Sequence, residues 1–206
     1  MYDNPDVGAP TASPRERVLT AAYELFSRRG IRAVGTDEVI ARAGVARATL
    51  YRHFATKNDL VVAVLVRREE LWTRGLIEEQ SRQRGNTPEE QLLAIFDVMH
   101  DWFRLSDRYE GCSFINVLFE VGPDHPAGQA CITHIDHVRD IVRRRAVAAG
   151  LTDVEEFASS WHILMKGAIV LAAVGDLDAA LRARKMARFL IDEHRPPSAA
   201  DTGEAV

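Results

Sequence analysis

Helical spacing of apolar residues along almost the whole chain is the feature that most constrains this fold. Between residues 13 and 195 apolar side chains recur every three or four positions, and no stretch alternates polar and apolar residues as a strand does. Two segments also open with the local chemistry of a helix start: Ser13-Pro14 followed by Glu16, and Thr87-Pro88 followed by Glu90. The sequence therefore predicts an all-α protein of about nine helices.

Further helix boundaries are predicted from residues that cap helices. Short polar side chains suit the N-cap position, and glycine suits the left-handed residue that ends a helix. The further predicted helix starts are Thr36, Thr56, Thr152 (in a capping box with Glu155) and Asp176. The predicted helix ends are Gly30, Gly44, Gly85 and Gly150.

The charge of the chain is unevenly distributed. The net charge is −4, yet residues 13–57 hold nine Arg or Lys against four Asp or Glu, while the rest of the chain from residue 58 is acidic. A basic head on an acidic body is typical of a nucleic-acid-binding protein. We therefore predict a disordered arm (1–12), a helix-turn-helix DNA-binding domain (13–57), a larger helical domain (58–195) and a disordered tail (196–206).

Two short predicted helices flank Gly44-Val45 and form a candidate helix-turn-helix. Gly44 tolerates the positive φ that the turn requires, and apolar residues such as Val39 and Leu50 can lock the helices together. From Val45 to Lys57 the chain carries cations and no carboxylate. Because carboxylates repel phosphate, this segment is suited to contact DNA.

The stretch from Gly35 to Phe54, which reads GTDEVIARAGVARATLYRHF, resembles the tetracycline-repressor (TetR) family. The resemblance covers about residues 14–65, and Lys57 fits it as well. Ala46 and Ala48 depart from it, since Ser and Gly are common at these two positions. The resemblance implies a transcription regulator and not an enzyme, without cofactor or metal. It also implies double-stranded DNA with a palindromic operator, a second copy of the chain and an unidentified small-molecule effector as partners.

Individual roles follow from the resemblance. Residues that match phosphate-contacting positions are Thr36, Tyr51, His53 and Lys57. Residues on the outward face, which can meet base edges, are Arg47, Ala48, Thr49 and Arg52. The alternative is that Tyr51 and Phe54 belong to the core and that the arginines are only solvated. At the level of function, we expect a repressor that an apolar or amphipathic ligand releases, with an activator or an effector-independent regulator as the alternative.

The resemblance also implies that the helical domain 58–195 is a ligand-binding and dimerisation domain, which holds the effector pocket and the dimer interface. Apolar residues with a few polar groups are what a small-ligand site needs, although an aromatic stripe is also typical of plain core. The candidate ligand-binding residues are Trp72, Phe96, Met99, His100, Trp102, Phe103, Phe114, Asn116, Phe119 and His134. Small residues in the last two helices, among them Ala168 and Ala172, suit close helix packing, either across a dimer or inside the core.

A few other residues suggest alternative sites or functions. His134, Asp136 and His137 could begin a metal site, Cys112 could sense oxidants, and the run from Arg143 to Arg145 reads as a solvated face. An all-helical enzyme or an interaction scaffold is disfavoured, because no catalytic constellation is visible and a scaffold leaves the basic motif unexplained. The longest apolar run, residues 167–174, is too short to cross a membrane, so we expect no membrane association and a cytoplasmic protein.

Overall fold

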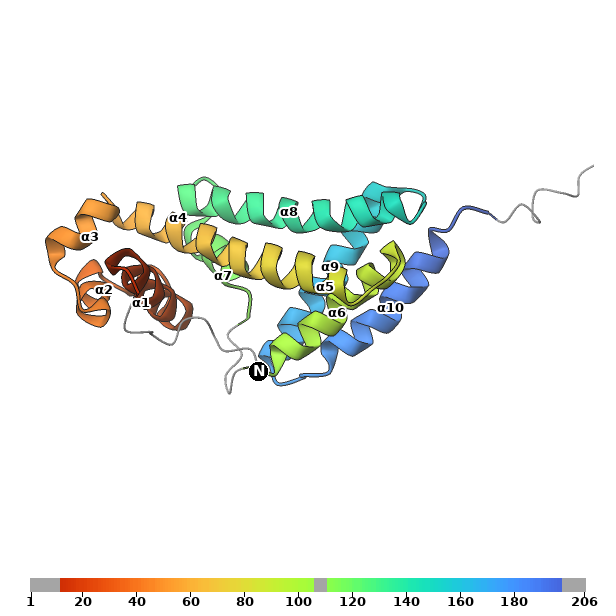
Figure 1. Ribbon diagram of the computed structural model, residues 1–206, viewed down its shortest axis with the longest axis horizontal. Coiled ribbons are helices and arrows are strands. Elements are labelled where there is room, and N and C mark those ends of the chain that lie inside the picture. Colours follow the sequence, from red (N-terminus) through yellow and green to blue (C-terminus); the bar gives the residue numbers. More distant parts are fainter. Residues whose placement is uncertain (1–11, 106–110, 198–206) are drawn as a thin grey trace, which may run out of the picture. The chain divides into compact units, whose positions relative to one another are not determined.

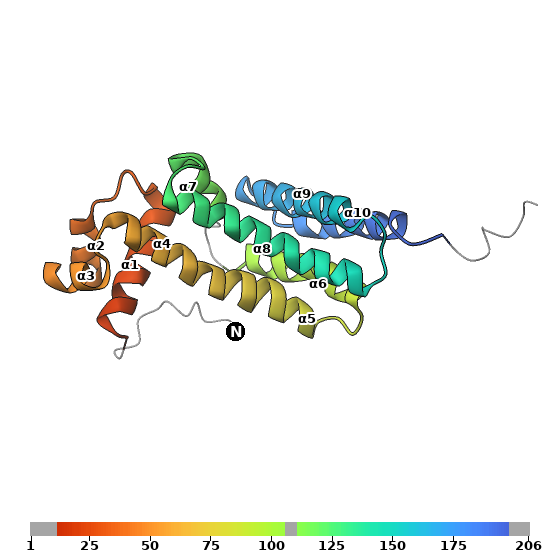
Figure 2. The same ribbon diagram turned by 90° about the horizontal axis from the view of Figure 1, so that it is seen from above.

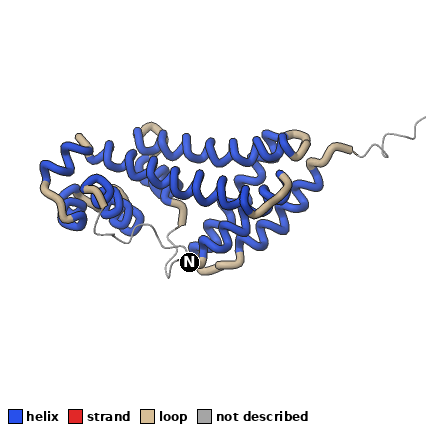
Figure 3. Tube along the Cα trace, viewed as in Figure 1, coloured by secondary structure: helices blue, strands red, loops and turns tan. Residues whose placement is uncertain are grey.

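The computed structural model describes residues 12–105 and 111–197. Within these ranges the chain forms only helices and loops, coloured blue and tan in Figure 3. The all-α prediction is confirmed for this part of the chain. The predicted disordered arm and tail fall largely on residues 1–11 and 198–206, which lie outside the described residues.

The helices follow one another in the order that Figure 1 labels. They are α1 (Pro14–Arg29), α2 (Thr36–Ala43), α3 (Arg47–His53), α4 (Lys57–Arg68), η1 (Glu69–Gln80), α5 (Ser81–Gln83), α6 (Pro88–Phe103), α7 (Ser113–Val121), α8 (Pro126–Ala148), α9 (Val154–Ala173) and α10 (Ala179–Glu193). The π-helix η1 continues α4 and leads into α5 without a loop, so the described residues contain nine continuous helical segments.

Several helix starts lie where the capping chemistry predicts them. The Ser13 hydroxyl accepts a hydrogen bond from the Glu16 amide (3.2 Å), and the Thr87 hydroxyl accepts one from the Glu90 amide (3.2 Å). The Glu90 carboxylate in turn accepts from the Thr87 amide, which completes a capping box. Thr56 caps α4 in the same way. These side chains satisfy amides that the first turn of a helix leaves without partners.

Three predicted helix starts are wrong. Thr36 is the first residue of α2 rather than its N-cap, which is a glycine. The Thr152 hydroxyl donates instead to the backbone oxygen of His194 (3.1 Å), and the following residue, Asp153, is the N-cap of α9. The N-cap of α10 is Asp178, two residues beyond Asp176. A distant acceptor outcompetes the local cap at Thr152, which sequence spacing does not reveal.

One compact unit contains residues 1–71 and 110–135. In it α1 packs against α2, α3 and α4. Fully buried side chains of this unit include Val18, Val39, Leu50 and Leu60. On the α7 side, the Phe114 ring stacks on His134 with a centroid separation of 3.3 Å. The predicted boundary between residues 57 and 58 does not coincide with this unit, which includes α4 and α7.

The second compact unit contains residues 72–109 and 136–206. Its helices α6, α9 and α10 pack together, and α9 and α10 run side by side in Figures 1 and 2. Phe96 and Phe157 pack against Trp161, with ring centroids 5.1 Å and 5.3 Å apart. The small residues Ala168 and Ala172 are buried within the single chain, so they belong to its core and are not free to form a dimer contact.

The expectation that residues 143–145 form a solvated face is wrong for Arg145. Its guanidinium is buried and donates to the Ser81 hydroxyl (2.7 Å) and to the backbone oxygens of Gln91 (3.0 Å) and Glu78 (2.8 Å). Burial lowers the pKa of Arg145 to about 10. Its neighbour Arg144 stays exposed, so a run of like charges divides between the surface and the interior.

Candidate nucleic-acid interface

The turn between α2 and α3 has the backbone geometry of a helix-turn-helix. Gly44 ends α2 in the left-handed region (φ 61°), where a residue with a side chain is strained. The Val45 amide then donates to the backbone oxygen of Ile40 (3.3 Å), which closes the turn. Val39 and Leu50 are fully buried. The two short helices are thus locked together by the residues that the sequence singled out.

The outer face of α3 is exposed and cationic. Its exposed residues are Arg47, Ala48, Tyr51, Arg52 and His53. Thr49 is half-buried, and no acidic residue occurs in the helix. Phe54, which directly follows, is only 3 % exposed and belongs to the core, whereas Tyr51 is 38 % exposed. The core alternative therefore holds for Phe54 but not for Tyr51.

Two side-chain contacts organise this face. The hydroxyls of Thr36 and Tyr51 lie 3.2 Å apart and join the start of α2 to α3. Arg47 forms an ion pair with Asp37 at 2.5 Å, in which both side chains are mostly exposed. Exposed pairs of this kind contribute little to stability, so the Arg47 guanidinium can leave Asp37 at a small energetic cost. No side chain caps the first turn of α3, as the alanine at position 46 implies.

Lys57 is tied to the turn that connects α1 and α2. Its Nζ donates to the backbone oxygen of Ile31 (2.6 Å), and the side chain is half-buried. On the other side of the same turn, the Glu120 carboxylate accepts from the amides of Ile31 (2.8 Å) and Arg32 (2.5 Å). Gly30 (φ 80°) permits this approach, because a Cβ there would lie 3.0 Å from a Glu120 oxygen. Glu120 is 89 positions from Ile31, and no local pattern indicated this contact.

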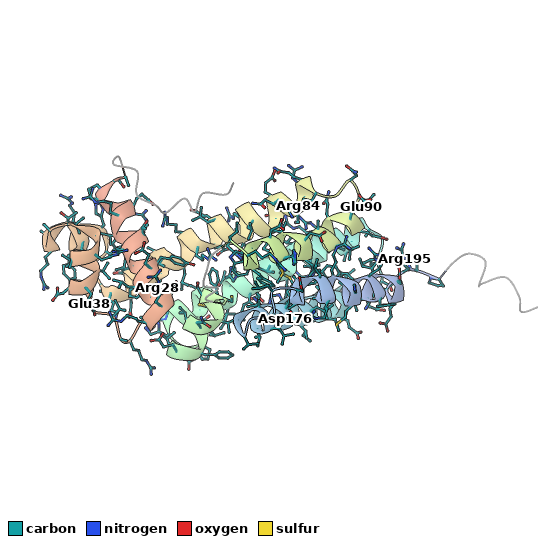
Figure 4. All side chains as sticks on the ribbon, turned by 90° about the horizontal axis from the view of Figure 1, so that it is seen from below. Arg28, Glu38, Arg84, Glu90, Asp176 and Arg195 are labelled. Carbon is teal, nitrogen blue, oxygen red and sulfur yellow. The ribbon has the colours of Figure 1, made fainter. Side chains whose placement is uncertain are left out.

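Ion pairs also fasten α2 to α1. Arg42 in α2 donates to Glu24 of α1 (2.6 Å), and Arg29 at the end of α1 pairs with Glu38 of α2. Figure 4 labels Glu38 on the exposed side of these helices. Its hydrogen bond from Arg29, and a second one from the Gly35 amide, lower the pKa of this carboxyl. Glu38 is therefore ionised at neutral pH, and Arg29 offsets its charge next to the DNA-facing helix.

The residues predicted for an effector pocket are divided between the two compact units. In residues 72–109 the Trp72 and Trp102 rings meet edge to face (5.2 Å between centroids). Phe96, Met99 and Phe103 are buried there, and His100 is half-buried. In residues 110–135 the stacked Phe114 and His134 are buried, while Asn116 is exposed and borders a cavity with α1 and α4. Phe119 is 84 % exposed, so it lines no enclosed pocket in this conformation.

Clusters of three or more metal-ligating side chains do not occur among the described residues, those around His134, Asp136 and His137 included. None of the described helices is long and apolar enough to cross a membrane. The left-handed turn, the buried lock between α2 and α3 and the exposed cations of α3 define a helix-turn-helix DNA-binding protein.

Comparison with known proteins agrees with this class. Residues 18–64 match the family model described as bacterial regulatory proteins of the tetR family. Among solved structures, SCO4454, a TetR-family transcriptional regulator from Streptomyces coelicolor, is 27% identical with a TM-score of 0.81, and the alignment covers 89% of this chain and 96% of that chain. Residues 18–64 therefore belong to the TetR family of DNA-binding regulators, a family that is not enzymatic, and the fold of the chain is that of a solved TetR-family transcriptional regulator.

Curated relatives match over shorter stretches. The transcriptional activator FasR of Mycolicibacterium smegmatis is 47% identical over 58 residues, which are 28% of this chain and 26% of the relative. The transcriptional repressor KstR2 of the same species is 32% identical over 93 residues, 45% of this chain and 44% of the relative. The chain thus spans between a quarter and a half of the length of these relatives.

Proposed function

We propose that this protein is a ligand-responsive transcriptional repressor that binds a palindromic operator as a homodimer. The observation that carries the proposal is the exposed face of α3, which presents Arg47 and Arg52 without a carboxylate in the helix. A helix of this kind enters the major groove, where arginine can donate twice to guanine and a methyl group can contact thymine. As a regulator of genes, the protein is expected to act in the cytoplasm, on the nucleoid.

Within the proposed interface, some residues are assigned to base edges and others to phosphates. Arg47, Ala48 and Thr49 lie in the first turn of α3 and are assigned to base edges, together with Arg52 one turn later. Thr36, Tyr51, His53 and Lys57 are assigned to the DNA backbone. The paired hydroxyls of Thr36 and Tyr51 are placed to bind one phosphate together, since either oxygen can donate.

Dimerisation is proposed through the exposed apolar face of α9 and α10. Large apolar side chains are exposed on these helices and on the loop between them: Ile163, Val170, Leu171, Val174, Leu177, Leu181, Met186 and Phe189. Ile163 of α9 is 71 % exposed and Phe189 of α10 is 75 % exposed, on two helices that pack against each other. Apolar patches of this kind mark protein interfaces. One short recognition helix contacts few bases, so two copies are needed for specific binding.

The effector site is proposed among the aromatic residues of the second compact unit. The indole nitrogen of Trp161 is buried and has no hydrogen-bond partner within the described ranges, 12–105 and 111–197. Buried polar atoms normally have a partner, so this donor is suited to an acceptor on an otherwise apolar ligand. Coupling to DNA requires that the ligand bind more tightly to a conformation whose two reading helices no longer match the operator.

We favour a repressor over an activator because the alignment with a repressor is longer than the alignment with an activator. The similarity to the repressor KstR2 extends over 93 residues, whereas that to the activator FasR is confined to 58. Activation, or regulation without an effector, remains the alternative outcome of the test.

A mobility-shift titration with the DNA upstream of the protein's own gene tests the proposal. We expect a specific complex with two chains per duplex, and less transcription in a reconstituted assay when the protein is added. A complex that raises transcription would support the activator. Equal affinity for the upstream region and a scrambled duplex would refute an operator in that region.

A further inference from the structure

A cavity of about 150 Å³ lies inside the unit that carries the reading helices. Its walls are α1, α4, α7 and the turn after α1. Most of the lining is apolar and consists of Phe26, Ile31, Val61, Val64, Leu65 and Val117, each at most 9 % exposed. Polar side chains at its border are Tyr23, Ser27, Ser113, Asn116 and Glu120, of which Glu120 is bonded to the amides of Ile31 and Arg32. None of the six apolar residues belongs to the aromatic cluster to which we assign the effector.

We infer that this cavity is a second small-molecule site, which takes one apolar ring of about the size of benzene. An apolar cavity of roughly this volume stays dry and accepts benzene in another protein, because a ring recovers dispersion contacts that the empty walls lack. Ser27 and Ser113 border the cavity and suit one small polar substituent on the ring. The occupant is therefore benzene, toluene or a monosubstituted analogue, and not a long acyl chain.

The cavity shares a wall with the turn that precedes the reading helices. Ile31 places its side chain in the lining and donates its amide to Glu120 (2.8 Å), while Arg32 donates to the other carboxylate oxygen. A ligand that packs against the Ile31 side chain binds most tightly when the two hydrogen bonds to Glu120 are formed. Its binding therefore opposes the breaking of these hydrogen bonds. Occupancy of the cavity thus holds the turn that leads into α2.

Toluene is the probe, used with the full chain and without DNA. At ten times its dissociation constant it should raise the Tm by about 3–5 °C, and slow hydrogen exchange at the Ile31 and Arg32 amides about tenfold. In methyl spectra, the Val61 and Val64 resonances should shift, while those of Val98 and Val142 in the second unit should not. The Val117→Phe variant, which places a ring in the cavity, should show none of these responses.

Two results would overturn the inference. One is a toluene titration that leaves the Val61 and Val64 methyl resonances in place or shifts those of Val98 equally, a test that needs no variant. The other is a folded Val117→Phe protein that toluene stabilises as much as the unmodified chain. Because no DNA is present, the test is independent of the proposed function: a protein that binds toluene but no operator refutes only the latter.

Discussion

The hydroxyl of Tyr51, in the middle of α3, lies 3.2 Å from the hydroxyl of Thr36, the first residue of α2. The contact joins the two helices at the surface, on the face that is proposed to contact DNA. The hydrogen bond between the two hydroxyls orients the Tyr51 ring. Because 38 % of Tyr51 is exposed, the rest of the protein packs against only part of this ring. The pair is thus better suited to bind a phosphate than to stabilise the core.

Removing either hydroxyl should weaken DNA binding more than folding. Tyr51→Phe and Thr36→Val should each reduce operator affinity by about 1 kcal/mol, roughly fivefold, with little change in Tm. Because the two oxygens are proposed to share one phosphate, the double variant should lose less than the sum of the single losses. Fluorescence anisotropy on one duplex at fixed salt measures the cycle. Strictly additive losses would show that the hydroxyls act separately.

Lys57→Ala should affect both the fold and the salt dependence of binding. The backbone oxygen of Ile31 loses a donor, so the free energy of unfolding should fall by about 1 kcal/mol. The slope of log K against log salt should become less negative by about 0.9 if the lysine also neutralises one phosphate. Arg144→Ala, which removes an exposed cation of α8 outside the proposed dimer interface, is the control and should change neither quantity appreciably. An unchanged slope with reduced stability would assign Lys57 to the turn alone.

Phe189→Asp should convert the dimer into a folded monomer. The change places a charge on an apolar side chain that is 75 % exposed in the single chain, so the monomer has little to lose. Phe119→Asp is the matched control, because Phe119 is 84 % exposed in the other compact unit. Sedimentation velocity at micromolar concentration should show a monomer for the first variant and a dimer for the second. Dimers of both would place the interface elsewhere.

Arg145→Met should destabilise the protein by about 2–4 kcal/mol, because the Ser81 hydroxyl and two backbone oxygens lose their buried donor. Arg144→Met removes the same charge one residue away, from an exposed pair with Glu78, and should change stability by less than about 0.5 kcal/mol. Urea unfolding of the two variants provides the comparison. Equal losses would mean that Arg145 is not the buried anchor described above.

What the sequence predicted well was local. Ser13, Thr56 and Thr87 cap helices through amides three residues away, and Gly44 ends α2 through its own backbone freedom. Each of these effects lies within a few positions of the chain, so spacing alone identifies it. For Tyr51 and Phe54 the sequence left the core as an alternative, and the structure confirms that alternative for Phe54 alone.

What the sequence missed depends on partners that are distant in the chain. Thr152 finds the backbone oxygen of His194, 42 positions away, and Glu120 finds the amide of Ile31. Ala168 can pack inside the chain or across a dimer, and helical spacing is the same in both cases. The split of the aromatic residues between two compact units was equally invisible, because periodicity shows which face is apolar but not what covers it.

Readout of the DNA sequence by α3 is tested by the Arg47→Ala variant. Affinities of the unmodified protein and the variant for operator and scrambled duplexes, measured by anisotropy across a salt series, give the specificity ratio. The variant should lose about 1–3 kcal/mol on the operator and less on scrambled DNA, with relaxed preference at one position of each half-site. Arg144→Ala should leave both affinities unchanged. Equal losses by Arg47→Ala on operator and scrambled DNA would contradict base readout by this arginine.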